Sequence, residues 1–124
     1  MGLTIMAPLF FFGPVENTSI DDTPVDAFAY PISESKAVTI MAMVTARDIV
    51  DGTANSYTVI GSASRVGAAA PTLGAATPDD IHTEEADIDW KADIVLSGND
   101  LVLRLTGEIG RTINWSATIQ VVTA

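Results

Sequence analysis

The feature that most constrains the fold of this chain is a two-residue alternation of apolar and polar side chains that runs through residues 94–122. In an extended chain, successive side chains point to opposite sides, so this alternation predicts strands with one buried and one solvated face. The last strand is the clearest, with its apolar positions at Ile113, Trp115, Ala117, Ile119 and Val121. Strands joined by tight turns favour a structural building block over a catalyst.

Similar alternation upstream predicts strands over residues 36–47, 57–64 and 88–96. The residues at 97–100 and 107–110 are turn formers, which predicts two hairpins. We therefore predict an all-β fold, an antiparallel β-sandwich of jelly-roll or immunoglobulin type, over residues 27–124. The predicted core contains Val38, Ile40, Val44, Trp90, Leu103, Leu105, Trp115 and Ile119.

One strand carries apolar residues on both of its faces. Between Val38 and Ala46 the alternating positions are apolar, and Met41 and Met43 lie on the opposite face. Because strands buried on both faces read as near-continuous apolar runs, we expect this strand to be covered on both sides. The residues at 67–78 are rich in Gly, Ala and Pro, which predicts a long loop.

The charge of the chain excludes one class of partner. Sixteen acidic and six basic residues give a net charge of −10, and the cations are scattered along the sequence. Nucleic-acid binding needs clustered cations that neutralise phosphates, so we expect no nucleic-acid partner. The mean hydropathy of +0.32 is high for a small soluble protein, which suggests that other subunits cover part of the surface.

The N-terminal segment, residues 1–26, is predicted to be an apolar arm followed by a connector. Residues 3–12 are largely apolar but too few to cross a membrane, so no membrane association is expected. The turn formers at 13–25 predict the connector. The arm either docks on a neighbouring subunit or forms the first strand of the sheet. In the first case the contact residues are Leu3, Ile5, Met6, Leu9, Phe10, Phe11 and Phe12.

The sequence offers weak candidates for chemistry. His82, the single histidine, lies in an acidic stretch, and nothing in the sequence pairs it with a nucleophile. Asp87 and Asp89 offer the oxygen ligands that Ca²⁺ prefers, but no calcium loop surrounds them, and a solvated acidic strand face is the alternative. Trp90, Trp115 and the two tyrosines could stack on sugars, although both tryptophans fall in phase with the core. We predict no enzyme activity, no cofactor and no metal.

The C-terminal residues also resemble a known family. The resemblance rests on Asp89-Trp90, on the segment 96–107 with its Ser-Gly-Asn turn and Thr-Gly end, and on the segment 111–119 with its Thr-Ile-Asn-Trp-Ser-Ala run. These motifs are similar to the C-terminal β-module of tailed-bacteriophage structural proteins. The likeness extends over roughly residues 38–122 and departs from the family at 67–78.

The resemblance implies a structural protein of the virion. It favours a capsid decoration or head-fibre protein that assembles as a homotrimer and contacts the major capsid protein or another virion protein. A tail-fibre or appendage protein is the first alternative. A glycan-binding β-sandwich module is the second.

Overall fold

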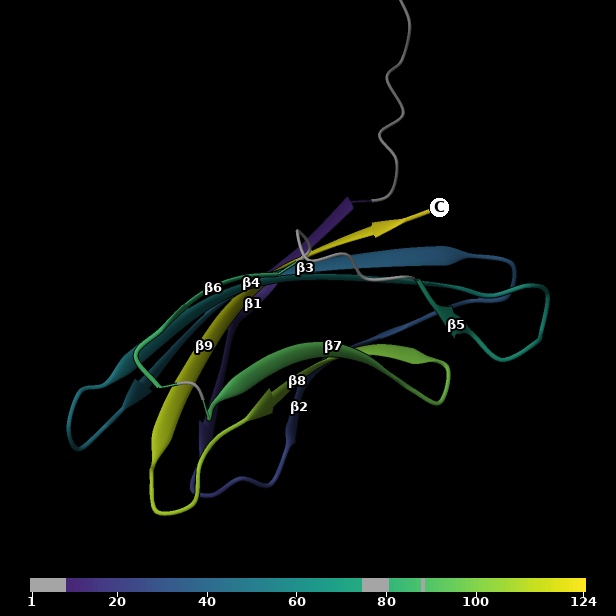
Figure 1. Cartoon of the computed structure of the whole chain (residues 1–124). Coiled ribbons are helices and arrows are strands. Elements are labelled where there is room, and N and C mark those ends of the chain that lie inside the picture. Colours follow the sequence, from purple (N-terminus) through teal and green to yellow (C-terminus); the bar gives the residue numbers. More distant parts are fainter. Residues whose placement is uncertain (1–8, 75–80, 88) are drawn as a thin grey trace, which may run out of the picture.

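The computed structural model describes residues 9–74, 81–87 and 89–124, and within these residues the chain forms strands and turns and no helix. The strands form two antiparallel sheets, which Figure 1 shows as two stacked layers. The large sheet has the order β1 (Leu9–Ser19), β9 (Ile113–Thr123), β3 (Ala37–Asp48) and β4 (Ala54–Ser64), with β5 (Thr72–Leu73) and β6 (Ile81–Glu85) both paired to β4. The small sheet has the order β2 (Val25–Pro31), β8 (Asp100–Thr106) and β7 (Lys91–Ser97). The all-β sandwich predicted from the sequence is therefore confirmed.

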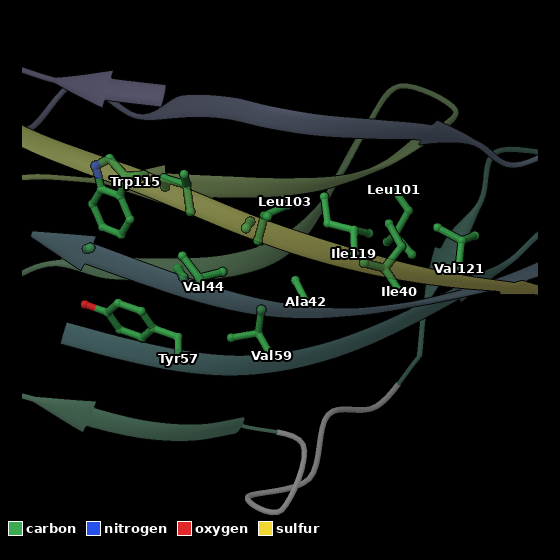
Figure 2. Close-up of a cluster of buried hydrophobic side chains, with 14 of the residues drawn as sticks. Ile40, Ala42, Val44, Tyr57, Val59, Leu101, Leu103, Trp115, Ile119 and Val121 are labelled. Atoms are coloured by element: carbon green, nitrogen blue, oxygen red, sulfur yellow. The ribbon is translucent and has the colours of Figure 1, made fainter. Parts of the chain in front are cut away.

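The hydrophobic core lies between the two sheets (Figure 2). The eight residues predicted for the core are all buried, and Ile40, Trp90 and Leu103 are fully inaccessible. The most regular alternations of buried and exposed residues belong to β3 and β9, each of which lies between two neighbouring strands. The backbone of a central strand is paired on both sides. Its sequence pattern therefore reflects which face of the sheet each side chain points to.

The predicted connector is wrong for residues 13–19, because these residues continue β1. The register of β1 against β9 shifts between Phe12 and Val15, where the two residues Gly13 and Pro14 form a bulge. Gly13 has a φ of +132°, and a Cβ on it would lie 2.8 Å from the carbonyl oxygen of Ala117. An edge strand tolerates Pro, which lacks a backbone donor, and Gly tolerates this φ, so residues that usually end a strand continue this one.

The acidic segment also differs from its prediction. The strand expected over residues 88–96 begins at Lys91 as β7, and the Asp89 amide donates a hydrogen bond of 2.9 Å to Oδ1 of Asp87. An Asp side chain that accepts from the amide two residues later forms a local turn. The short strand β6 precedes this turn and was not predicted. Of the predicted loop, residues 72–73 form β5, and residues 75–78 lie outside the described part.

Candidate assembly surface

The outer face of the large sheet is apolar at one end and polar at the other. At the apolar end, paired positions run across the sheet from Leu9 to Val122, and from Phe11 through Gln120 and Met41 to Ile60 of β4. Phe11 is 72% exposed and Met43 is 63% exposed. We call this surface the apolar outer patch, and it consists of Leu9, Phe11, Met41, Met43, Ile60 and Val122.

The patch corrects the expectation that β3 is buried on both faces. Its inner positions are buried, but Met43 is exposed and Met41 is half-buried. The reason is that the large sheet is the outer layer of the sandwich in the described part of the chain, so nothing packs on its outer face (Figure 1). The apolar residues there are therefore surface residues.

A hollow of about 340 Å³ lies beside the protruding ring of Phe11. Its lining includes Gly13 from the bulge, Met41 and Met43 from β3, and Thr118 from β9. Gly13 has no side chain, and the bulge moves the next β1 residue out of register with β9. The outer face of β1 therefore carries no side chain next to the hollow at Gly13. The patch thus presents a protruding ring next to an apolar depression.

The inner face of the same segment of β1 packs on the edge strand of the small sheet. The ring centroid of Phe12 lies 4.9 Å from that of Phe28 and 6.2 Å from that of Tyr30. The ring centroid of Phe10 lies 6.2 Å from that of Tyr30. Phe10 and Phe12 remain 42% and 36% exposed, so this aromatic cluster lies at the open side of the sandwich.

Four of the seven predicted contact residues therefore have a position in the fold. Leu9 and Phe11 lie in the apolar outer patch, and Phe10 and Phe12 lie in the aromatic cluster. They belong to the first strand of the large sheet, the alternative that the sequence left open. Leu3, Ile5 and Met6 lie outside the described residues.

The polar end of the same face holds a second hollow, of about 510 Å³. Hydroxyl, amide, carboxylate and guanidinium groups line it, from residues that include Glu16, Thr45, Arg47 and Asn114. The aromatic side chains considered for sugar stacking are elsewhere. Trp90, Trp115 and Tyr57 are buried in the core, and Tyr30 packs in the aromatic cluster.

An ion-pair network closes the end of the sandwich that is opposite the apolar outer patch, and Arg111 is its centre. Its guanidinium lies 3.1 Å from Asp48, 3.0 Å from Asp51, 3.5 Å from Asp87 and 2.6 Å from Glu108. Partial desolvation lowers the pKa of Arg111, but hydrogen bonding to Asp48 and the neighbouring acidic charges outweigh it and raise that pKa. The β3–β4, β6–β7 and β8–β9 connections are held together at this ionic end.

The predicted calcium ligands lie at the ionic end. Carboxylate oxygens of Asp87, Asp89 and Glu108 lie within 4.8 Å of one another. Desolvation and the charge of Asp87 raise the pKa of Glu108, as expected where carboxylates crowd together. Arg111 pairs with both Asp87 and Glu108, so a protein cation already neutralises part of this charge. His82 belongs to β6, where its backbone pairs with Thr58.

Asn55 attaches the acidic turn to the core. This fully buried side chain accepts hydrogen bonds from the amides of Ala86 and Asp87 at 2.7 and 3.0 Å. It donates to the Asp87 carbonyl oxygen and to the Tyr57 hydroxyl oxygen at 2.5 and 2.9 Å. Burial raises the pKa of Tyr57 to about 12.

Sequence reasoning missed both Asn55 and Arg111. Their partners are 24 or more residues away, apart from Tyr57 and Glu108, so no local spacing identifies them. One signal was available for Asn55. Asn55, Tyr57 and Val59 are alternating positions of one strand, so their side chains point to the same face. The sequence alternation therefore predicts that the Asn55 amide lies on the buried face.

Neither a protein-family model nor a curated protein sequence matches the chain. The described part of the chain also contains no helix with the length and apolar character that a membrane crossing requires.

The solved structures that are similar to the chain include two phage tailspike proteins. One is the tailspike protein of Acinetobacter baumannii phage AM24, with 9% identity and a TM-score of 0.41 over 92% of this chain and 26% of that protein. The other is the tailspike protein of Acinetobacter phage vB_ApiP_P1, with 14% identity and a TM-score of 0.37 over 100% of this chain and 23% of that protein. The chain thus spans about a quarter of each tailspike protein. Similarity at this level carries no argument about function.

Proposed function

We propose that this chain is a non-enzymatic structural module of a tailed-bacteriophage particle, on the capsid surface or in a tail appendage. In this proposal it assembles with copies of itself, as a homotrimer, through the N-terminal end of β1. The sequence motifs at 89–119 support the phage class. The observation that carries the assembly role is the apolar outer patch, which lies on the edge strand β1 and on the regular strands next to it.

The local structure supports a role in assembly for this region. In β1, the segment from Leu9 to Phe12 is apolar on both faces, and each of its side chains is more than one-third exposed. Large exposed apolar surfaces in soluble proteins usually mark interaction sites. An edge strand adds unpaired backbone groups that can pair with another chain. The segment 1–8 is contiguous with this strand, and Leu3, Ile5 and Met6 remain predicted contact residues.

Purified phage particles that encode this chain provide the test. Mass spectrometry should detect the chain in the particles, and gold-labelled antibodies should place it on the capsid surface or on an appendage. Antibody preincubated with the purified protein is the control for specific labelling. Absence of the chain from washed particles would contradict the proposal.

A glycan-binding module predicts different results. Soluble protein would then bind a glycan array, and a bound sugar or Ca²⁺ would raise the melting temperature because a ligand stabilises the state that binds it. Such binding without the chain in the particle would favour that module.

A further inference from the structure

We infer that the apolar outer patch is the surface through which one copy of this chain contacts another, with Phe11 of one copy seated in the hollow beside Gly13 of the next. This inference rests on the self-assembly in the proposed function and names the surface that performs it. This surface is larger than the contact predicted for the N-terminal arm alone. It also includes Met41, Met43, Ile60 and Val122, which lie on strands far from the N-terminus in sequence.

The size of the patch matches one side of a protein interface. Leu9, Phe11, Met43 and Val122 are 38%, 72%, 63% and 39% exposed, and a large side chain such as Phe has about 150–250 Å² of surface. These four residues therefore expose roughly 300–500 Å² of apolar area, to which the partly buried Met41 and Ile60 add. A standard interface buries about 800 Å² on each partner, of which somewhat more than half is apolar. The half-exposed Phe10 and Phe12 adjoin the patch at the β1 edge and extend this area.

The shape of the patch allows two copies to fit together. Phe11 protrudes and the hollow lies beside it, so every copy carries both a projecting ring and a depression lined by Met41 and Met43. An aromatic ring buried in an apolar pocket is the usual centre of an interface. A contact in which each copy supplies both parts can close a ring, and the homotrimer is one such ring.

The charge distribution makes a second copy the partner. Each copy carries a net charge of −10, so two copies repel each other across most of their surfaces. All six residues of the patch are uncharged, and the chain has no charged residue before Glu16. Contact through this surface therefore brings apolar area together without placing acidic groups against each other.

Two lysine substitutions on one strand test the inference. Met43→Lys places a charge in the patch, and Thr45→Lys places the same charge two residues further along the same exposed face of β3. The mass of full-length wild-type protein and of both variants would be measured by light scattering over a concentration series. We expect the wild type and Thr45→Lys to form the same oligomer, and Met43→Lys to associate about 30-fold more weakly or worse, as at an interface hot spot.

Three results would overturn the inference: a monomeric wild type, a Met43→Lys variant with wild-type mass, or an equal loss of association in both variants. Circular dichroism checks that each variant is folded. If Met43→Lys is unfolded, the uncharged variant Phe11→Ser decides, and retention of the oligomer by that variant would again overturn the inference. Detection of the chain in phage particles together with an unaffected Met43→Lys oligomer would refute this surface and leave the proposed function standing.

Discussion

The ionic end and the apolar outer patch differ in whether their side chains have partners within one copy of the chain. At the ionic end, Arg111 and Asn55 satisfy acidic groups and loop amides within one copy of the chain. At the patch, regular strands present Phe11 and Met43 to solvent with no covering element in the described residues. In our proposal, one region is complete in the monomer, whereas the other is completed by a second copy. Substitutions at the first should therefore change stability, and substitutions at the second should change association.

The largest effect on stability is expected for Asn55→Ala. This substitution removes four hydrogen bonds and leaves the Ala86 and Asp87 amides without their acceptor. An unsatisfied buried polar group costs about 1–3 kcal/mol, so we expect a loss of about 3 kcal/mol in the free energy of unfolding. Denaturant unfolding measures it. A loss no larger than that of an average surface substitution would show that the ionic end does not depend on this side chain.

Arg111→Ala should have the next largest effect. It leaves Asp48, which is only 3% exposed, without a counter-charge, and it leaves three further carboxylates close together. Removing one partner of a buried pair costs about 3–5 kcal/mol, and partial exposure of Arg111 reduces our expectation to about 2 kcal/mol.

The matched control is Arg104→Ala, which breaks the exposed pair with Asp26 on the small sheet. Exposed pairs contribute about 0–1 kcal/mol, so this variant should unfold almost as the wild type does. Equal losses in the two arginine variants would contradict the distinction between the two sites.

Neighbouring residues of β1 allow a comparison between its two faces. Phe12 contacts Phe28 and Tyr30 on the inner face, so Phe12→Ala should cost about 1–2 kcal/mol, less than the 3–5 kcal/mol of a fully buried Phe. Phe11→Ala should change the stability of the monomer by less than about 0.5 kcal/mol, as exposed substitutions usually do, while weakening association. Unfolding is best compared in the Met43→Lys background, where self-association does not add to stability. A larger loss of unfolding free energy in Phe11→Ala than in Phe12→Ala would show that the inner and outer faces of β1 are assigned wrongly.

The smallest effect concerns acid stability. Hydrogen bonds from Thr53, and then the charge of Arg111, hold the pKa of Asp51 below its ordinary value of 3.8. Because the pKa is lower in the folded protein, this stabilisation is present above about pH 4 and is lost as the pH falls through the folded-state value. Melting temperatures measured from about pH 6 down to pH 3 should fall less steeply in Asp51→Asn than in the parent protein. An unchanged slope would show that this carboxylate adds nothing to the acid dependence.

The sequence was sufficient to predict the two-layer fold and the core, because those depend on local alternation. The apolar residues that alternate from Ile113 to Val121 in the sequence are the ones that lie on the buried face of the central strand β9. The same reasoning missed the continuation of β1 through residues 13–19, because Gly13 and Pro14 normally indicate a break but here occupy a bulge in an edge strand. The outer patch could not be predicted either. Apolar residues on both faces of β3 fit a covered strand equally well, and only the arrangement of the sheets shows that one face is open.

The most direct test of the account is the mass of the full-length wild-type protein in solution, measured by light scattering across a wide concentration range. The account predicts an oligomer, three times the 13.0 kDa chain mass for the proposed homotrimer, that dissociates only on dilution. A mass of one chain at every concentration would contradict the claim that copies of this chain meet through the apolar outer patch.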